Sequence, residues 1–468
     1  MKINNSILLN TDSYKSSMFL QYPPHTEFVH SYIESRGGRF DKTVFFGLQA
    51  FLKDYLSTPI TKTDVAIAKE IWEAHGEPFN EAGWNYIVDT YHGYLPVRIK
   101  AVAEGSVVPT KNALVTIENL DPHCFWLTTW IETALLRAVW YPTTVATQSH
   151  AIRKMIKRHL EETGDVSGLA FKLHDFGARG VSSFESAVLG GMAHLATGAM
   201  GTDTMSGILG ALVYYDEPMA GYSIPAAEHS TITSWGRFGE RNAYHNMLKQ
   251  FAKPGAMVAI VSDSYDVFRA CQDLWGGELK QEIIDSEAVV IIRPDSGDPL
   301  EVNAKLIQIL DKAFGHTIND KGYKVLNHVR LIQGDGVNYE VIDNILTNFK
   351  LKGYSADNIA FGMGGGLLQQ LDRDTQKFAM KCSAAKIDGK WVDVQKDPIT
   401  DHGKKSKKGR QMLQHNKYTN EWRTISESTE ITCEGGWEDA LETLYQFGAI
   451  VKTTTFSEIR ANVAKDLD

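Results

Sequence analysis

The stretch AVVIIRPDSG at residues 288–297 runs directly into DPLEVNAKLIQILDKAFG, and this succession indicates how the middle of the chain folds. A continuous β-branched run ends in a polar break with glycine, and the apolar residues that follow recur with the period of a helix. Three further segments share this design: MVAIVSDS at 257–264, VRLIQGDG at 329–336 and NIAFGMGGG at 358–366. Continuous apolar strands that alternate with helices predict a parallel sheet covered by helices, either open or closed as a barrel.

The last of these segments contains four glycines within the five residues 362–366, just before an apolar stretch resumes. Glycine weakens both strands and helices, so we expect another group to approach this backbone closely. In parallel sheets, ligands bind at the carboxyl ends of the strands, where backbone N–H groups and helix N-termini favour anions. We therefore interpret FGMGGG and QGDG as candidate phosphate cradles; the alternative for each is a tight turn.

Carboxylates and one arginine follow the same strands. Each carboxylate can cap the next helix, but the group also suits hydroxyl recognition on a sugar or Mg²⁺ binding through oxygen. Arg293 precedes Asp295 in one turn, where its guanidinium suits a phosphate or pyrophosphate. The carboxylates are Asp263, Asp266, Asp295 and Asp335.

Two segments outside these strands carry groups that can bind a ligand. In KLHDFGARG at 172–180, Phe176 can stack on a planar ligand whose substituent binds Arg179; the alternative is a core ring beside a surface arginine. In GYSIPAAEHST at 221–231, His229 follows a rigid proline turn, and its role is either catalytic or structural. Spacing alone favours the structural alternative for both segments.

Composition and charge restrict the class of protein. With 468 residues, the chain exceeds the size of one hydrophobic core, so we expect two domains. The net charge of −9 argues against broad attraction to nucleic acid or membrane, and the basic run KKSKKGR at 404–410 fits a solvated loop or a local polyphosphate contact. Four distant cysteines without a C-x-x-C pair argue against disulfides and zinc and fit the reducing cytoplasm. They are Cys124, Cys271, Cys382 and Cys433.

Local patterns predict further elements. Residues 61–75 predict a helix with a threonine cap, and the alternation over 96–118 predicts a β meander. Residues 124–163 predict helices interrupted at Pro142. The apolar stretch FWLTTWIETALLRAVWY within them contains Glu132 and Arg137, which indicates a buried helix rather than a membrane span.

Longer motifs, in order from about Leu8 to about Asn462, closely resemble the nicotinamide phosphoribosyltransferase family of type II phosphoribosyltransferases. They include TDSYK at 11–15, QYPP at 21–24, GTDT at 201–204, KDP at 396–398 and SKKGR at 406–410, with the segments quoted above. The resemblance implies an enzyme of NAD salvage that joins nicotinamide to phosphoribosyl pyrophosphate, giving nicotinamide mononucleotide and pyrophosphate. It implies an irregular α/β barrel-like core with parallel strands at 151–375, and a β-rich domain formed by an N-terminal α+β segment at 1–150 and a C-terminal segment at 376–468.

The same resemblance assigns roles to single residues. The pyridine ring would lie between Phe176 and the partner subunit's Tyr14. Around the ring would lie Arg179, Ser223 and Asp203, the last as acceptor for the amide NH₂. His229, paired with Asp266, would be phosphorylated by ATP. Asp295 and Asp335 would hold the ribose hydroxyls, and Gly334, Gly364 and Gly365 the 5′-phosphate. Pyrophosphate or ATP phosphates would bind Arg293 together with the partner subunit's Arg36, the partner subunit's Arg373, the partner subunit's Lys381 and the partner subunit's Lys396.

The resemblance also implies ATP as an activating co-substrate, Mg²⁺ held mainly by substrate phosphates, and a homodimer with shared active sites, without nucleic-acid or membrane partners. An ionised Asp203 would accept a hydrogen bond from nicotinamide and repel the carboxylate of nicotinate, which predicts discrimination by about 10⁴. Two alternatives remain: nicotinate phosphoribosyltransferase, with a carboxylate-binding pocket, and a non-catalytic binding protein with this fold. Ala178 and Met363 depart from residues common in animal relatives, so we expect a differently shaped tunnel beside the ring.

Overall fold

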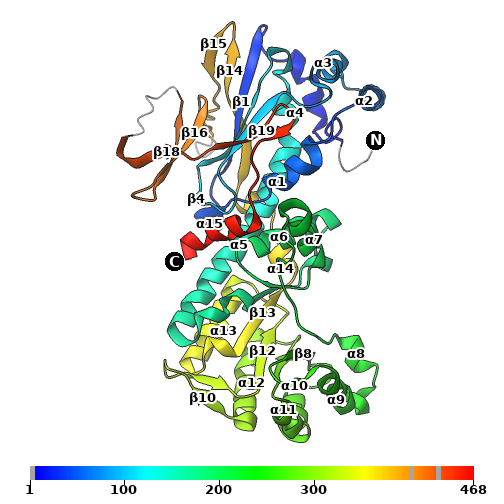
Figure 1. The fold of residues 1–468 in the computed structure, drawn as a ribbon, viewed down its shortest axis with the longest axis vertical. Helices are drawn as coiled ribbons and strands as arrows, with labels where there is room; N and C mark the ends of the chain where they lie inside the picture. Colours follow the sequence, from blue (N-terminus) through cyan, green and yellow to red (C-terminus); the bar gives the residue numbers. More distant parts are fainter. Residues whose placement is uncertain (1–5, 401–404, 428–433, 468) are drawn as a thin grey trace. The chain divides into compact units, whose positions relative to one another are not determined.

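The computed structural model describes residues 6–400, 405–427 and 434–467 (Figure 1). The chain forms two compact units. The first comprises Met1–Thr147, Val213–Glu217 and Leu371–Asp468, and the second comprises Gln148–Leu212 and Pro218–Gln370. Each unit therefore takes in stretches that are far apart in the sequence.

A six-stranded parallel sheet forms the centre of the second unit, with the strand order β7-β6-β13-β12-β9-β8. Four of its strands are those that the β-branched runs predict: β8 (Met257–Val261), β9 (Val289–Arg293), β12 (Val329–Gln333) and β13 (Ile359–Met363). The other two, β6 (Leu173–Asp175) and β7 (Gly201–Thr202), are too short to give a periodic signal. The predicted α/β class is thus confirmed.

One short segment, residues 222–227, bridges the two edges of this sheet. On the β7 side, the N–H of Thr202 donates to the carbonyl of Tyr222 at 3.0 Å. On the β8 side, the N–H of Ala227 donates to the carbonyl of Ala259 at 2.9 Å. Because the same segment pairs with both edge strands, the sheet takes the barrel-like form that the family resemblance implies.

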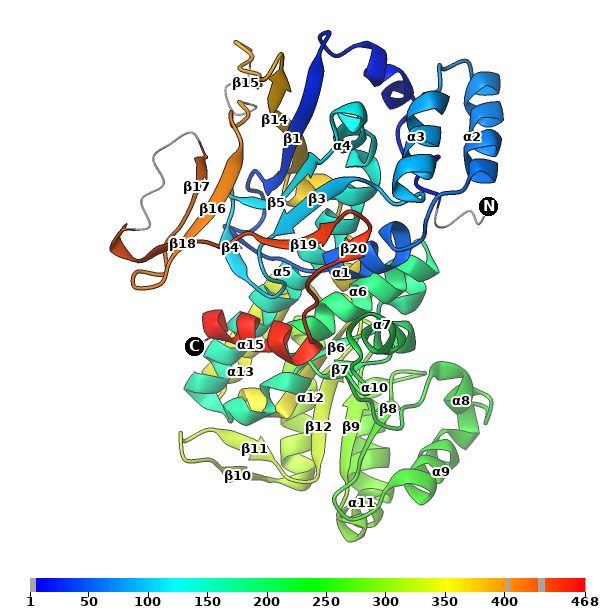
Figure 2. The same cartoon turned by 45° about the horizontal axis from the view of Figure 1, so that its top comes forward.

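Helices cover this sheet, and Figure 2 shows α12 beside β12 and β9. Helix α12 (Pro299–Phe314) has a good cap: the Asp298 carboxylate accepts the N–H of Glu301, and Pro299 is the first helical residue. Helix α13 (Tyr339–Leu351) buries an apolar face formed by Ile342, Ile345, Leu346 and Phe349. Other elements of the unit include α6 (Phe184–Ala196), α8 (His229–Thr233), α9 (Glu240–Phe251), α10 (Val267–Arg269), α11 (Lys280–Ser286), α14 (Gly365–Leu368), β10 (His316–Ile318) and β11 (Lys324–Leu326).

The first unit is built on a seven-stranded antiparallel sheet with the order β15-β14-β1-β5-β3-β19-β20. Its strands come from both ends of the chain, which confirms the predicted β-rich part: β1 (Thr26–Ser35), β3 (Val97–Ala101), β5 (Ala113–Asn119), β14 (Phe378–Ile387), β15 (Lys390–Asp393), β19 (Glu442–Gln446) and β20 (Ala449–Ile450). Smaller sheets are formed by β16 (Gln411–Asn416), β17 (Trp422–Ser426) and β18 (Trp437–Asp439), and by β2 (Lys42–Val44) and β4 (Val107–Pro109). Its helices include α1 (Leu48–Phe51), α2 (Lys62–His75), α3 (Glu81–Tyr91), α4 (Leu127–Trp130) and α15 (Phe456–Leu467).

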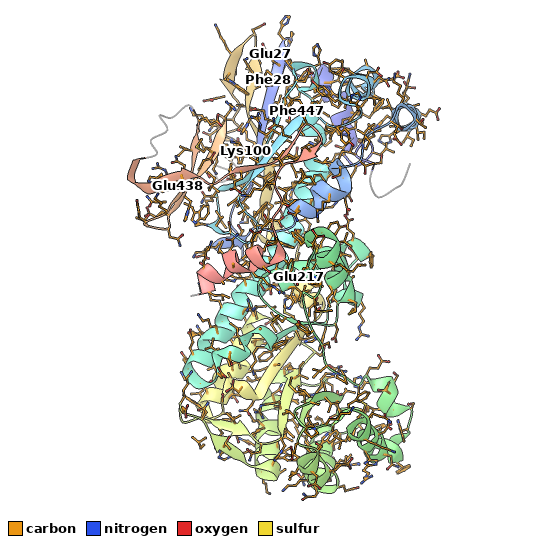
Figure 3. All side chains as sticks on the ribbon, viewed as in Figure 1. Glu27, Phe28, Lys100, Glu217, Glu438 and Phe447 are labelled. Atoms are coloured by element: carbon orange, nitrogen blue, oxygen red, sulfur yellow. The ribbon has the colours of Figure 1, made fainter. Side chains whose placement is uncertain are left out.

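Side-chain contacts join the N-terminal and C-terminal segments within this unit. Figure 3 labels Lys100 on β3, whose Nζ lies 3.7 Å from Oδ2 of Asp439, and Phe447, whose ring stacks on Tyr91 with centroids 5.8 Å apart. Helix α2 starts after Thr61, whose side chain caps it as predicted. Cys124, Cys271 and Cys382 are free thiols, and Cys433 lies outside the described residues.

Two local predictions are wrong. The strands within 96–118 do not form a simple meander, because β4 leaves its neighbours to pair with β2 while β3 pairs directly with β5. Helix α5 (Glu132–Thr163) continues through Pro142 instead of stopping there. Pro142 has no N–H to donate to the carbonyl of Ala138, so the helix continues with one backbone bond missing. In the described part of the chain, no helix is long and apolar enough to cross a membrane.

Candidate active site

Side chains from several strands meet at the carboxyl ends of the parallel sheet. The clearest marker is Gly334, which follows β12. A Cβ atom built there would lie 3.2 Å from Cε2 of Phe176, 3.3 Å from Oδ1 of Asp295 and 3.5 Å from Cδ of Arg293. The ends of β6, β9 and β12 are therefore in van der Waals contact, and the structure brings these predicted site residues together.

The first glycine of FGMGGG has a role that the sequence did not suggest. A Cβ on Gly362 would lie 1.9 Å from Cε2 of Phe176, so the aromatic ring occupies the space that a side chain would need. The glycines predicted to hold phosphate differ. A Cβ on Gly364 would meet only the carbonyl of Phe176, at 3.6 Å, and one on Gly365 would meet nothing within 4 Å. Packing within the protein therefore does not require glycine at these two positions, and their backbone faces open space.

A hydrogen-bonded trio lies beside the Phe176 ring. Nε2 of His174 lies 2.9 Å from Oδ1 of Asp203, and the hydroxyl of Ser223 donates to the same oxygen at 2.6 Å. Burial acts to raise the pKa of Asp203, but the bonds from His174 and Ser223 and the charge of Arg293 outweigh it and lower this pKa below its usual value. Asp203 is thus held as a carboxylate.

His174 is a site residue that the sequence reasoning missed, although a signal for it exists. His174 and Phe176 are two residues apart at the end of a strand, so their side chains point to the same face. Their ring centroids are 5.1 Å apart. The alternation in KLHDF therefore contains the information that both rings face the same site.

The predicted pairing of His229 with Asp266 is wrong. Nε2 of His229 lies 2.9 Å from Oδ1 of Asp263, and Nδ1 lies 4.0 Å from Oδ2 of Asp295. The carboxylate of Asp266 instead caps α10, because Oδ1 accepts the N–H groups of Phe268 and Arg269, each at 3.0 Å. The capping alternative applies to Asp266, and Asp263 is the partner of His229.

Arg293, the last residue of β9, and Asp295, two residues later, have charges that their neighbours do not fully balance. The Nε atom of Arg293 is buried and finds no hydrogen-bond partner among the described residues, since Oδ1 of Asp295 is 3.9 Å away. Burial raises the pKa of Asp295, the charge of Arg293 opposes that rise, and Asp263 and Asp335 add to it. A buried donor without a partner beside crowded carboxylates is the arrangement expected where a ligand completes the bonding.

A cavity of about 510 Å³ opens from this site into the interior of the barrel. Phe176, Asp203 and Ser223 line it near the carboxyl ends of the strands, and Met257 and Val289 line it at the amino ends of β8 and β9. The cavity therefore extends along the strands. Its size is in the range of small-molecule binding sites.

The predicted phosphate ligands Arg36, Lys381 and Lys396 lie in the first unit, where they are electrostatic neighbours. Burial lowers the pKa of the Lys381 ammonium, and Glu132 opposes this shift, while Lys396, Arg36 and Lys15 add to it. A terminal nitrogen of Arg36 is buried without a hydrogen-bond partner among the described residues. Carboxylates compensate part of this charge, since Oε1 of Glu34 lies 3.3 Å from Nε of Arg36 and Oε2 of Glu132 lies 2.6 Å from Nζ of Lys15. The unpartnered nitrogen of Arg36 is the donor that remains for an anion.

Three other predicted site residues lie outside these two clusters. Tyr14, in the first unit, is 56% exposed, and Arg373 forms an ion pair with the adjacent Asp374 at 3.1 Å. Arg179 is exposed after β6 and forms no hydrogen bond or ion pair with any described residue. In the basic run, Lys404 lies outside the described residues. Lys405 and Lys408 form ion pairs with Asp397 and Asp393, at 2.9 Å and 3.6 Å.

A metal site built by the protein alone does not appear in residues 6–400, 405–427 and 434–467, where no group of three or more His, Cys, Asp or Glu side chains could hold an ion. The carboxylates after β8, β9 and β12 are close enough to influence one another, as the pKa of Asp295 shows. A divalent cation fits here only when substrate oxygens supply most of its ligands.

Comparisons with known proteins agree with this geometry. The sequence model of the Nicotinate phosphoribosyltransferase (NAPRTase) family matches residues 171–430, and that of the Nicotinamide phosphoribosyltransferase N-terminal domain matches residues 6–99. The nicotinamide phosphoribosyltransferase of Xanthomonas campestris pv. campestris (strain 8004) is 56% identical over 98% of both chains. That of Acinetobacter baylyi is 30% identical over 98% of this chain and 97% of its own.

Two solved structures share the fold at low sequence identity. The nicotinate-nucleotide pyrophosphorylase of Pyrococcus furiosus has a TM-score of 0.63 at 15% identity, over 100% of this chain and 97% of its own. Human nicotinic acid phosphoribosyltransferase has a TM-score of 0.56 at 16% identity, over 98% of this chain and 93% of its own. Fold, site and full-length relatives lead to one conclusion: the chain is a pentosyltransferase and belongs to the nicotinamide phosphoribosyltransferase family.

Proposed function

We propose that this enzyme transfers the phosphoribosyl group of phosphoribosyl pyrophosphate to nicotinamide, giving nicotinamide mononucleotide and pyrophosphate. The choice of nicotinamide rests on Asp203. One oxygen of this carboxylate accepts from both His174 and Ser223, and its other oxygen receives no hydrogen bond within the part of the chain that the structure describes. That second oxygen can accept the amide N–H of a pyridine stacked on Phe176. The carboxylate of nicotinate would meet like charge there.

The chemistry needs no general base, because the pyridine nitrogen attacks with its own lone pair. The bond from the anomeric carbon to pyrophosphate breaks while the bond to the pyridine nitrogen forms, so negative charge grows on the departing group. Cations that face that group stabilise the transition state. Arg293, with its unpaired buried Nε, is the cation of this unit that suits the role. Asp295 and Asp335 suit the ribose hydroxyls, and the open backbone at Gly364 and Gly365 suits the 5′-phosphate.

Magnesium and ATP are further parts of the proposal. Mg²⁺ would be held by substrate phosphates with help from Asp295 or Asp335, and it would neutralise charge on the pyrophosphate. ATP would phosphorylate His229. Because Nε2 of His229 bonds the Asp263 carboxylate, Nε2 carries the proton and Nδ1 keeps the lone pair that can take the phosphoryl group, with ADP leaving.

A second copy of the chain is the proposed partner. Helix α7 (Met205–Tyr215) presents an apolar stripe, in which Met205, Leu209 and Leu212 are 68%, 49% and 47% exposed. These residues recur at i, i+4 and i+7, so they share one helix face. An exposed stripe of this kind is typical of an interface. We propose that the homodimer covers it, that residues such as the partner subunit's Lys381 complete each site, and that the enzyme is cytoplasmic.

Product analysis by mass spectrometry tests the reaction. Purified enzyme is incubated with phosphoribosyl pyrophosphate, Mg²⁺ and either nicotinamide or nicotinate, with and without ATP. We expect nicotinamide mononucleotide as the main product. The value of kcat/KM for nicotinamide should exceed that for nicotinate by a factor of about 10⁴. Equal or better use of nicotinate would favour the runner-up, nicotinate phosphoribosyltransferase, for which the family match over residues 171–430 leaves room.

Mixing of inactive chains tests the shared site. A chain with Asp295→Ala and a chain with Lys381→Ala are unfolded together and refolded. If each site takes residues from two chains, mixed dimers contain one intact site and activity returns. If every site is made by one chain, the mixture stays inactive. Light scattering with Leu209→Asp, which puts a charge on the α7 stripe, checks the dimer itself: we expect monomers.

A further inference from the structure

His174 lies between two glycines of the parallel sheet, and one of them leaves the space that its ring fills. In the parallel sheet it lies in register with Gly362 of β13 on one side and Gly201 of β7 on the other. A Cβ on Gly201 would lie 2.7 Å from Nδ1 of His174, so the imidazole fills the space above that glycine. Its side chain is 13% exposed. The ring is therefore fixed by the sheet and has little freedom to turn.

Among the described residues, this fixed ring makes one hydrogen bond, from Nε2 to Oδ1 of Asp203 at 2.9 Å. Ser223 donates to the same oxygen from the segment that closes the barrel. Two donors on Oδ1 determine the rotation of the carboxylate, and they leave Oδ2 as its open acceptor. Asp203 itself is 47% exposed and follows the two-residue strand β7, so without these donors its side chain would be free to rotate.

We infer that His174 is a positioning residue for pyridine specificity: by donating from Nε2 to Oδ1 of Asp203, it directs Oδ2 of that carboxylate at the carboxamide of the substrate. The inference rests on the proposed function, because it takes nicotinamide as the pyridine. His174 does not touch the reacting atoms. It acts through Asp203, so its loss affects recognition of the pyridine more than transfer of the ribose.

The competing role for His174 is packing alone, since its ring lies 5.1 Å from that of Phe176. Three substitutions separate the two roles. His174→Phe keeps a ring of similar shape and removes the donor. His174→Gln places an amide N–H near the position of Nε2 and removes the ring. His174→Asn is a second polar variant, but its amide ends near the position of Nδ1 and does not reach Asp203.

We expect His174→Phe to raise the KM for nicotinamide roughly ten- to a hundredfold, which is the effect of losing a hydrogen bond to a charged group. The KM for phosphoribosyl pyrophosphate should change far less, and the preference for nicotinamide over nicotinate should fall by a similar factor. His174→Gln should restore most of the preference, and His174→Asn should not. If His174→Phe folds poorly in thermal melts, the comparison of Gln with Asn still decides between the two roles.

A double-mutant cycle with Asp203→Ala completes the test. On that background His174→Phe should add no further change to the KM for nicotinamide, because the residue through which it acts is absent. A full additive effect there would overturn the inference, as would a His174→Phe enzyme with wild-type preference or a His174→Gln enzyme no better than His174→Asn. Wild-type enzyme that fails to use nicotinamide would instead overturn the proposed function.

Discussion

Gly362 and Phe176 fit together so closely that a Cβ atom on the glycine would lie 1.9 Å from Cε2 of the ring. Gly362→Ala must therefore push the ring aside, at a cost typical of overpacking, about 1–3 kcal/mol. Because the displaced ring no longer stacks on the pyridine, we expect the KM for nicotinamide to rise at least tenfold, which loses about 1.4 kcal/mol of binding. Steady-state kinetics and thermal melts measure both effects.

The matched control for this variant is Gly277→Ala, because a Cβ there would meet only the carbonyl of Gln272, at an ordinary 3.6 Å. It should leave the activity close to wild type. An active Gly362→Ala enzyme with an unchanged KM for nicotinamide would mean that the ring can move without loss, and the stacking role of Phe176 would have to be given up.

A substitution at Gly365 should affect binding of phosphoribosyl pyrophosphate without a cost in stability, unlike Gly362→Ala. Its Cβ would meet nothing within 4 Å, so Gly365→Ala should leave the melting temperature unchanged or slightly higher, since alanine is the better residue in helix α14. If the backbone here binds the 5′-phosphate, the new methyl group blocks its approach, and we expect the KM for phosphoribosyl pyrophosphate to rise about tenfold or more. Kinetics with each substrate varied in turn separate this result from that of Gly362→Ala. An unchanged KM would exclude the cradle at this position.

Sequence patterns predicted the parts of the fold that are long and regular. The runs beginning at Met257, Val289, Val329 and Ile359 are mainly apolar strands of five residues each, long enough to stand out between polar breaks and helical patterns. Strands β6 and β7 have three and two residues, so no period exists to be read. Closure by residues 222–227 depends on bonds to both edge strands, and a local pattern does not encode contacts so distant in sequence.

The candidate site was predictable by residue type but not by partner. Charged residues after the strands indicated where ligands would bind, because carboxyl ends share one edge of a parallel sheet. Which aspartate faces His229 depends on the turn geometry after β8. Asp266 is one residue before a helix and its carboxylate is used by backbone N–H groups, whereas Asp263 is the second residue after the strand and bonds His229. Likewise, glycine at position 362 makes room for the ring of Phe176. Composition alone does not distinguish a glycine that makes room for a ring from one that lets a phosphate approach the backbone.

The pairing of His229 with Asp263 leads to a labelling prediction. With γ-labelled ATP, the wild-type enzyme should take up label and His229→Ala should not. Asp263→Asn should reduce labelling strongly, because a neutral amide holds the imidazole in place less well than a carboxylate and does not stabilise positive charge on the ring. The control is Asp266→Asn, which keeps a capping side chain and should label nearly as well as wild type. Equal labelling of His229→Ala and wild type would remove the phosphohistidine, and a greater loss in Asp266→Asn than in Asp263→Asn would favour the other aspartate.

Lys172 gives the last prediction, on stability against pH. Its ammonium lies in the barrel and donates to the carbonyls of Ala356, Asp357 and Ile359 at 2.9–3.1 Å, and burial lowers its pKa from 10.5 to about 8. Between pH 8 and 10.5, the unfolded chain holds this proton while the folded chain has released it. Unfolding therefore takes up a proton, and this residue makes the folded state more stable as the pH rises through that range.

The variant Lys172→Met lacks the titrating group, so the unfolding free energy of wild type minus that of Lys172→Met should rise from pH 8 to 10.5 and then level off. Urea unfolding of both proteins at several pH values measures the difference, in which titration of all other groups cancels. Lys352→Met, at an exposed lysine after α13, is the matched control for removing a lysine outside the barrel. A difference that stays flat or shrinks with pH would mean that the three carbonyls keep Lys172 charged despite its burial, and that the cavity wall carries a permanent positive charge.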